Sequence, residues 1–518
     1  MPLLATGAAL PLYLAWAVFL ATGGGDLAAQ TAWAGFTERH PGTPYNFSWY
    51  GGLHTVNYSW ISPYLMAVFG VRTVTAAAGL VSTWLAGMLC VRSGVSRPLW
   101  PALLSMVTLW CNVVCGRTTF ALGVAFGLAA CLAIVGTRRP WLALAFSALA
   151  TLSSPVAGLY LTVVGAACLL RRDWARAAAL IAPPFVVVGL TTLFFPFEGQ
   201  HPMAPGRIWP PVFCSLAIVV LAPRRWHAVK LGAAVYAVGV GLTFLVDSPI
   251  GTNVERLAQL AAPVVLLAAL LAPGLHVARR VALAAALVLS THWVVDKTLE
   301  DVRLYTEVPA WARHTDGVVA ALDRLGADRT RVEVVPARNH REASVLAPHV
   351  NMARGWNRQA DVERGRLFYA GHPGVDVPRS AFSPAAYRAW LDRWAVGFVV
   401  LPRGARPDGP AEAEAALVRK GTDWLEPVWQ DRHWRVLRVR DAVPLVSAPA
   451  SVVRSDEAAL VVRAPRPGSV LVRVAHSPWL RAQGACLKEA EDGFTRLTVK
   501  KPGEYRITSS YGLPRGSC

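Results

Sequence analysis

Charge is scarce in the first 300 residues of this 518-residue chain, and acidic residues are the scarcest, with eight Asp and Glu against 18 Lys and Arg. The whole chain is 54% hydrophobic and 16% charged. That composition is too apolar for a soluble globular protein of this length and excludes a wholly cytosolic enzyme. The last 218 residues carry 33 basic and 24 acidic side chains, so we expect two regions that fold in different solvents.

Several chemical motifs are missing as well. The sequence has no Walker motif, HExxH or GxSxG, which removes support for ATP-driven transport and for the familiar soluble hydrolases. It has no CxxC pair, so a structural zinc site is not expected. The net charge is +19, but 45 of the 51 basic residues are Arg, many of them paired between apolar runs. Since no zinc-finger or helix-turn-helix pattern accompanies them, nucleic acid is not an expected partner.

Long apolar runs fill residues 2–296. A membrane span needs about 20 apolar residues, or fewer where it leans on its neighbours, and this criterion gives about eleven candidates: 3–22, 62–91, 98–114, 118–136, 140–152, 156–170, 175–195, 208–222, 231–246, 257–274 and 281–296. The run 62–91 exceeds one crossing and predicts a short interfacial helix followed by a span. We predict a polytopic α-helical membrane domain over residues 1–298, with a large first outer loop at 23–60.

The short loops support an orientation, because Lys and Arg favour the cytoplasmic side. Basic pairs or triplets recur in alternate loops near residues 92–97, 138–139, 171–176, 224–230 and 279–280. The intervening loops hold one Arg or none. We therefore expect a multi-pass protein of the plasma membrane with a cytoplasmic N-terminus and an extracytoplasmic region after residue 297.

Periodicity changes near residue 300 to that of a soluble domain. Residues 331–335 and 396–401 predict buried strands, and residues 310–325 and 384–394 predict helices, which gives an α/β domain at 299–440. Short strands separated by Pro/Gly turns predict a β-sandwich or barrel at 441–518. Cys486 and Cys518 are the only cysteines in polar sequence. In an extracytoplasmic domain they form a disulfide, and the alternative is two unpaired thiols.

Polar residues of the first outer loop are the first candidates for chemistry, since polar groups at a membrane face are costly without a function or a partner. Asp26 follows the first span directly; it is either a base for an acceptor hydroxyl or the N-cap of a helix starting at Leu27. The other candidates mix rings, amides and charges, which suits a carbohydrate surface: Glu38, His40, Trp49, Tyr50, His54, Asn57 and Tyr58. The alternative for the aromatic members is an interfacial belt.

A second candidate group lies at residues 253–256. Arg256, at the start of a predicted helix, is placed to hold the phosphate of a lipid carrier through paired hydrogen bonds; the alternative is an ion pair with Glu255, with Asp247 or with a lipid headgroup. Asn253 and Glu255 flank it, and Arg117, alone in a short outer turn, is placed for the same task.

The arrangement resembles the GT-C superfamily of membrane glycosyltransferases, and in particular large bacterial multi-pass membrane proteins of high-GC genomes. The matching stretches are DLAAQ…WYGG…YSWISPYL in the first loop, SPVAGLYL at 154–161, DSPIGTNVERL at 247–257, RNHREASVLAPHVNMARGWNRQADVERGRLFY at 338–369 and YRAWLDRWAVGFVVLP at 387–402. The resemblance implies a GT-C-like fold and transfer of a sugar from a polyprenyl-phosphate donor to an extracytoplasmic envelope glycan or glycolipid. It assigns the base to Asp26. One acid stands where many members carry two, so the use of a divalent metal is left open, and no other cofactor is implied.

Two other functions compete with this hypothesis. A facilitator-type transporter requires a polar site near the bilayer midplane, and charged residues are scarce there. A non-catalytic envelope scaffold would bind its partner through residues 300–518. Product formation from a lipid-linked sugar discriminates, because neither rival makes a product.

Overall fold

The protein is described here by a computed structural model, which covers residues 1–135 and 139–512. The chain divides into two compact units. Unit 1 comprises Met1–Thr22 and Tyr58–Thr306, and unit 2 comprises Gly23–Asn57 together with the chain from Glu307 onward. The sequence places the first outer loop in the membrane domain and the boundary at residue 298. The structure instead packs residues 23–57 with the C-terminal half and continues the last helix of unit 1 to Tyr305.

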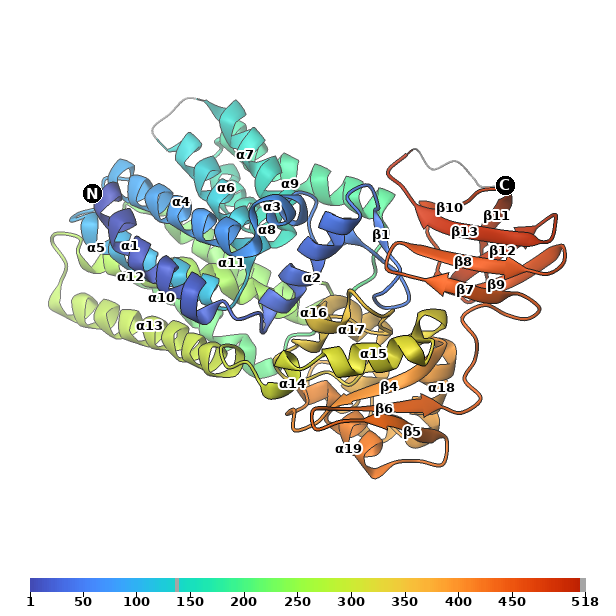
Figure 1. The fold of residues 1–518 in the computed structure, drawn as a ribbon. Helices are drawn as coiled ribbons and strands as arrows, with labels where there is room; N and C mark the ends of the chain where they lie inside the picture. Colours follow the sequence, from blue (N-terminus) through green and yellow to red (C-terminus); the bar gives the residue numbers. More distant parts are fainter. Residues whose placement is uncertain (136–138, 513–518) are drawn as a thin grey trace. The chain divides into compact units, whose positions relative to one another are not determined.

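Unit 1 is a bundle of helices packed side by side (Figure 1). Its α-helices are α1 (Pro2–Ala15), α3 (Ser62–Phe69), α4 (Val71–Arg92), α5 (Leu99–Val114), α6 (Thr118–Ile134), α7 (Pro140–Ser153), α8 (Pro155–Leu170), α9 (Trp174–Phe194), α10 (Trp209–Leu221), α11 (His227–Leu245), α12 (Glu255–Leu270) and α13 (Val277–Tyr305). A π-helical turn, Trp16–Leu20, extends α1, and short 3₁₀ turns precede α10 and α12.

Each of the eleven predicted apolar runs contains a helix. Within the described residues, six helical segments are long and apolar enough to cross a membrane: Pro2–Leu20, Val71–Arg92, Trp174–Phe194, His227–Leu245, Gly251–Leu270 and Val277–Tyr305. The other five apolar helices have 10–17 residues, about 15–26 Å at 1.5 Å per residue. These five are shorter than the ~30 Å hydrocarbon core of a bilayer, so the expected count of eleven spans stays a prediction.

Two breaks between helices have local causes in the sequence. The long run 62–91 divides at Gly70, whose φ of +82° is a left-handed backbone conformation that glycine adopts without steric cost. Pro155 opens α8 directly after α7 ends at Ser153, because proline disfavours helical backbone in the residue before it.

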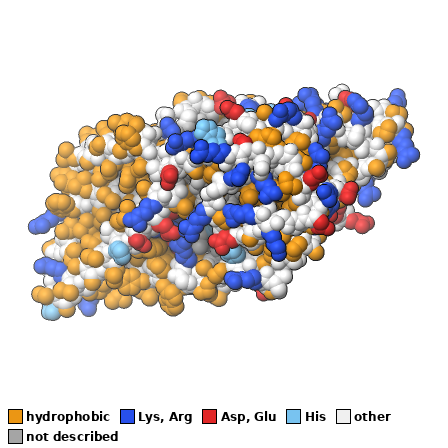
Figure 2. Space-filling model, turned by 60° about the horizontal axis from the view of Figure 1, so that its bottom comes forward, with side chains coloured by type: hydrophobic (Ala, Val, Ile, Leu, Met, Phe, Trp, Pro, Cys, Tyr) orange, Lys and Arg blue, Asp and Glu red, His pale blue; other side chains and the backbone are white. Residues whose placement is uncertain are grey.

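The outside of unit 1 is strongly apolar. Large hydrophobic side chains stand exposed along α9, α11 and α13, among them Phe185, Leu193, Leu245 and Val288. Figure 2 shows hydrophobic side chains covering most of the visible face of this unit, at the left of the view. Because an apolar surface this large is costly in water, it identifies unit 1 as the part of the chain that lies in a lipid bilayer.

Unit 2 contains an α/β part built on a four-stranded sheet of order β3-β4-β6-β5. Its strands are β3 (Arg331–Val334), β4 (Val396–Pro402), β5 (Leu425–Gln430) and β6 (Trp434–Val439), and only the β3–β4 pair is parallel. The α-helices of this part are α14 (Ala310–Arg313), α15 (Asp316–Arg324), α16 (Glu342–Leu346), α17 (Arg358–Arg364), α18 (Pro384–Arg393) and α19 (Glu412–Lys420). The two buried strands and the helix at 384–394 are confirmed, while the helix expected at 310–325 is interrupted between α14 and α15.

The C-terminal part of unit 2 is a β-sandwich. One sheet has the order β10-β13-β8-β7 and the other β11-β12-β9, with every pairing antiparallel. The strands are β7 (Ser451–Ser455), β8 (Ala459–Ala464), β9 (Gly468–Ala475), β10 (Leu480–Ala482), β11 (Ala485–Glu489), β12 (Phe494–Val499) and β13 (Gly503–Ser509). Inward residues such as Val462, Val472, Leu497 and Ile507 form its core. Cys486 is disulfide-bonded, whereas Cys518, its predicted partner, lies outside the described residues.

The N-terminal segment of unit 2 consists of α2 (Asp26–Arg39) and a small hairpin of β1 (Tyr45–Asn46) and β2 (Leu53–His54). A buried arginine fastens the hairpin. Arg331 is 1% exposed and donates to the carbonyl oxygens of Trp394 at 3.0 Å, Arg473 at 2.6 Å and Gly51 at 3.3 Å. Burial lowers the pKa of its guanidinium to about 10, and the three acceptors offset part of the cost of burying this group.

Candidate functional site

Four basic side chains gather at one end of the helices of unit 1. Arg117 lies between α5 and α6, Arg207 in the turn before α10, Arg256 in the first turn of α12, and Lys297 in the last third of α13. All four interact electrostatically with the carboxylate of Glu255. We call this set, with Glu255 and Asp301, the cation cluster.

Glu255 lies inside the cation cluster and is 2% exposed. Its Oε2 lies 3.6 Å from Arg207 Nη1, and the Gln259 side chain donates to the same oxygen at 3.5 Å. Among the described residues, Oε1 is buried without a hydrogen-bond partner. The side chain of Arg207 is 45% exposed, so the ion pair joins a buried carboxylate to a cation that water reaches.

Asp301 is the second acid of the cluster. Its Oδ2 lies 3.8 Å from Arg117 Nη2 and accepts a hydrogen bond from the thiol of Cys115 at 2.8 Å. Sequence reasoning missed Lys297 and Asp301, because it ended the last span at 296. Their spacing of four residues, which places two side chains on one face of a helix, was the available signal.

Two buried tyrosines hold the backbone on which Glu255 and Arg256 sit. The hydroxyl of Tyr160 donates to Asn253 O at 2.5 Å, and that of Tyr236 donates to Val254 O at 2.6 Å. Asn253, predicted as a ligand residue, therefore contributes its carbonyl group to the framework.

An aromatic contact restrains Arg256, and loop contacts restrain the segment that carries Arg207. The Arg256 guanidinium lies 5.1 Å from the ring centroid of Phe120, within the range of a cation–π contact. The loop that carries Arg207 is tied down by His201, whose ring nitrogen Nε2 lies 2.6 Å from Thr252 Oγ1 and whose backbone N–H donates to Ser248 O. Arg207 and Arg256 thus belong to two segments that are joined next to the cluster.

The charges of the cation cluster define what it can bind. Four cations face two carboxylates, which leaves a net charge of +2. Guanidinium groups match phosphate oxygens in bidentate geometry, and an anion placed among several of them is strongly favoured where water is partly excluded. The structure brings together Arg117, Glu255 and Arg256, three of the sequence-predicted residues, in a site that suits a phosphate group.

Asp26 belongs to unit 2, where it is the first residue of α2 and half-buried. The N–H of the preceding Gly25 donates to Asn339 O at 2.8 Å, and α2 packs against α16. Gly25 has φ +62° and ψ −139°, a conformation that only glycine adopts readily. Asp26 is therefore the first helical residue, and the N-cap position is Gly25, with no side-chain cap hydrogen bond. The interpretation of Asp26 as the N-cap of a helix starting at Leu27 is wrong by one residue.

Two other predicted residues lie at the far end of α2. Glu38 is exposed and twelve residues from Asp26, about 18 Å along a helix, so these two acids do not form a pair. His40 follows α2, and its Nε2 lies 3.3 Å from Glu457 Oε1, the oxygen that also accepts from Arg39 at 2.6 Å.

Two of the predicted sugar-binding aromatics, Trp49 and Tyr50, are buried inside unit 2 and do not lie on an open surface. Trp49 and Tyr50 are each 1% exposed. Trp49 covers Gly355 so closely that any side chain there would collide with its ring. The Tyr50 hydroxyl donates to Gly355 O at 2.8 Å and accepts from the Asn357 N–H at 3.1 Å. Neither ring has a free face for a sugar in this structure.

The remaining members of that group are divided between the units. His54 is 6% exposed and its Nε2 lies 2.9 Å from Ser477 Oγ. Asn57 is half-buried at the end of the unit 2 segment, and Tyr58, also half-buried, is the first residue of the returning unit 1 chain. No metal cluster of three or more His, Cys, Asp or Glu side chains occurs in the part of the chain that the structure describes.

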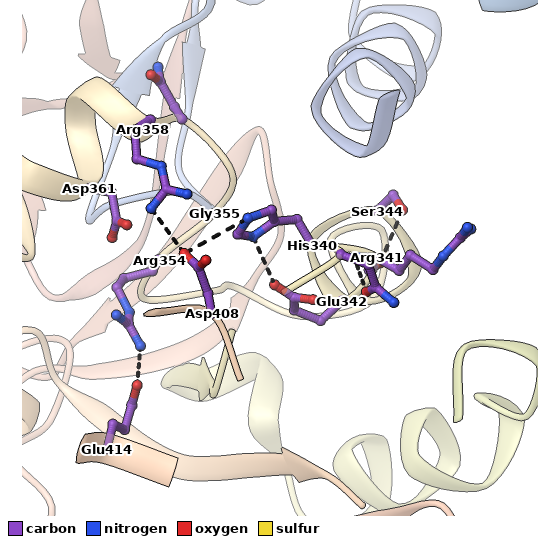
Figure 3. A network of polar contacts seen from close by, with 12 residues as sticks. His340, Arg341, Glu342, Ser344, Arg354, Gly355, Arg358, Asp361, Asp408 and Glu414 are labelled. Carbon is purple, nitrogen blue, oxygen red and sulfur yellow. Dashed lines mark hydrogen bonds and ion pairs between the residues drawn. The ribbon is translucent and has the colours of Figure 1, made fainter. Parts of the chain in front are cut away.

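Unit 2 holds a separate ionic network, shown in Figure 3. Its centre is Arg354, 3% exposed, which donates to Glu333 Oε1 at 2.5 Å and also pairs with Glu414. Both acids are fully buried, and burial raises the pKa of each carboxyl. The guanidinium also lies 3.6 Å from the ring centroid of Phe368.

A second part of the network continues from Arg358. Arg358 Nη1 donates to Asp408 Oδ2 at 2.9 Å, and His340 Nε2 lies 3.9 Å from the same oxygen. Burial alone would raise the pKa of Asp408, but Arg358 and His340 together lower it below its usual value. The His340 ring stacks on Trp356 with centroids 3.4 Å apart. This network is interior to unit 2, so it stabilises the fold.

Comparison with known proteins gives limited matches. A family model described as a domain of unknown function, DUF8823, matches residues 447–486, in the β-sandwich. No curated protein matches the chain.

Two solved structures of the arabinofuranosyltransferase AftD from Mycobacteria are similar to the chain. A mutant form has 14% identity and a TM-score of 0.46, covering 92% of this chain and 43% of that one. A second structure of AftD has 15% identity and a TM-score of 0.44, covering 92% and 41%. The chain thus spans less than half the length of these proteins.

Proposed function

We propose that this protein is a membrane glycosyltransferase of the GT-C type that transfers a sugar from a lipid-phosphate donor to an envelope glycan or glycolipid. The observation that carries the proposal is the cation cluster of unit 1. A net charge of +2, built from four basic side chains, lies at one end of a bundle whose outside is apolar. A polyprenyl-phosphate sugar has both features that such a place favours, an anionic head and a long apolar tail.

The reaction follows from the chemistry of that donor. The acceptor hydroxyl oxygen bonds to the anomeric carbon, and the bond from this carbon to the phosphate oxygen breaks. The phosphate keeps the electron pair and leaves as a lipid phosphate monoester, and the hydroxyl proton passes to a base. Arg117, Arg207, Arg256 and Lys297 hold the phosphate and stabilise the charge that develops on it.

We assign the base to Asp26. What supports the assignment is its place in the sequence directly after the first helix and its position at the start of α2, half-buried and therefore open in part to solvent. A carboxylate accepts a proton from a hydroxyl group within hydrogen-bond reach as the new bond forms.

The test compares envelope glycans and glycolipids by mass spectrometry in a deletion strain complemented with wild-type or Asp26→Asn protein at equal membrane levels. We expect the wild type to restore a sugar that the variant does not restore. Glu412→Gln is the matched control, because it removes an exposed acid from the first turn of another helix, α19, and it should behave as wild type. Equal restoration by Asp26→Asn would overturn the assignment of the base, and a deletion strain with no missing sugar would overturn the proposed function.

A further inference from the structure

The position of Glu255 is unusual for a phosphate site. A buried carboxylate in the midst of four cations competes with the anion that those cations would bind. Its Oε1 makes no hydrogen bond among the described residues, and its Oε2 holds Arg207 at the long distance of 3.6 Å. A residue that served the fold alone would have closer contacts, as Arg354 has with Glu333 in unit 2.

The surroundings hold Glu255 in place. Tyr160 and Tyr236 bond the two carbonyl groups directly before it, and α12 continues from it without a break. The backbone that carries Glu255 therefore cannot move without disrupting several buried contacts. Arg207 is half exposed, and among the described residues its ion pair is the long one with Glu255, so it can exchange Glu255 for an incoming phosphate oxygen.

The two lipid phosphates of the proposed reaction differ in charge. The donor is a phosphodiester with one negative charge, whereas the product is a phosphate monoester with a charge of about −1.5 to −2 at pH 7. A site of four cations without Glu255 would bind the product much more tightly than the donor, because Coulomb attraction grows with the charge of the ligand. Slow product release would then limit turnover.

We propose that Glu255 is a positioning residue that weakens the binding of the dianionic product and so makes its release faster. This inference rests on the proposed function, in which the cation cluster binds a lipid phosphate. Glu255 repels a dianion about twice as strongly as a monoanion, which brings the affinities for donor and product closer together. When the product leaves, Arg207 returns to the carboxylate.

The experiment measures binding to the full-length protein in detergent by calorimetry at fixed ionic strength. The probes are farnesyl phosphate, a monoester, and its methyl ester, a diester. For Glu255→Gln we expect affinity to rise about tenfold for the diester and about hundredfold for the monoester. Asp247→Asn removes an exposed acid eight residues away and should change either affinity by less than about twofold.

The outcomes separate the two proposals. If the wild type binds neither probe, the cation cluster is not a lipid-phosphate site and the proposed function fails. If the wild type binds both and Glu255→Gln leaves the affinities unchanged or weaker, the role of Glu255 is overturned while the site stands. A wild type that prefers the monoester by hundredfold or more also overturns it, and this measurement needs no variant.

Steady-state kinetics provide a readout that a structural role would not produce. In Glu255→Gln both KM for the donor and kcat should fall, and added farnesyl phosphate should inhibit more strongly than in the wild type. Glu255→Asp keeps the charge and should restore most of kcat. A variant with raised KM and unchanged product inhibition would contradict the proposal.

Discussion

The two units each contain a cluster of arginines and acids, and the clusters differ in geometry and charge. In unit 2, Arg354 is 3% exposed and donates to Glu333 at 2.5 Å. In unit 1, the ion pairs measure 3.6 and 3.8 Å, and the Arg207 side chain is 45% exposed. Carboxylates outnumber cations around Arg354, whereas cations outnumber carboxylates around Glu255. Close, buried and acid-rich contacts stabilise a fold, and longer contacts with excess positive charge leave capacity for an anionic ligand.

Removing Arg354 is the most severe way to test the comparison. Arg354→Met leaves Glu333 and Glu414 buried without their cation, and breaking a buried ion pair in this way costs about 3–5 kcal/mol. We expect unit 2 to unfold at lower temperature, or not to fold, in thermal unfolding of the purified protein. Arg440→Met, which disrupts the exposed pair with Glu426, should cost less than about 1 kcal/mol. Equal losses in the two variants would contradict a structural role for the Arg354 network.

Removing one cation from the cluster of unit 1 should weaken ligand binding and leave the stability of the fold nearly unchanged, the reverse of the effect expected for Arg354. In the proposed site, Arg117→Ala deletes a charge-assisted contact to the phosphate, for which about 1.5–3 kcal/mol is typical. We expect farnesyl phosphate to bind about ten- to hundredfold more weakly by calorimetry, with little change in unfolding temperature. A large loss of stability without loss of binding would show that the cation cluster is structural, like the network of unit 2.

The buried acids of unit 2 should make its stability depend on pH, and Glu342 offers a test of this. Glu342 is 3% exposed, and burial raises the pKa of its carboxyl, an effect that His340 partly opposes. Because the folded protein then binds this proton more tightly than the unfolded chain, the contribution is fully present below the ordinary glutamate pKa of about 4.3 and is lost as pH rises through the folded pKa. Unfolding temperatures measured from pH 4 to 7 should fall less in Glu342→Gln than in the wild type. Parallel curves for the two proteins would show that Glu342 has the same pKa folded and unfolded.

The smallest effect on stability and binding is expected for an exposed ion pair that lies outside both clusters. Arg463 on β8 lies opposite Glu504 on β13, with Nη2 and Oε1 2.7 Å apart and side chains 63% and 49% exposed. Exposed pairs contribute about 0–1 kcal/mol. Arg463→Ala should change the unfolding temperature by only a degree or two and leave probe binding unchanged. A larger shift would mean that contact distance, and not burial, distinguishes the clusters.

Local features of the fold were predictable from the sequence. The apolar runs, the division of 62–91 into a short helix and a span, the separation of 140–152 from 156–170, and the strands at 331–334 and 396–402 follow from composition and periodicity over a few residues. Arg117 and Arg256 could be chosen as candidates because a lone cation between apolar runs is conspicuous. These features depend only on neighbours in the chain.

The rest depends on contacts between distant residues. Tyr50 reaches Asn357 across 307 positions, and Arg354 pairs with Glu414 across 60. Neither pairing leaves a trace in local periodicity. The sequence therefore suggests that the aromatic loop is exposed, although Trp49 and Tyr50 form part of the interior of unit 2.

The discontinuity of unit 2 has a consequence for how the protein is made. Residues 23–57 are synthesised about 250 residues before the segment beginning at Glu307 that buries them. At ordinary synthesis rates of about 5–20 residues per second, Trp49 and Tyr50 wait more than ten seconds without their final neighbours. Contacts of such long sequence separation also form slowly. Chains that stop short of the second half would expose these rings, and the exposed rings would make such chains targets for chaperones and quality-control proteases.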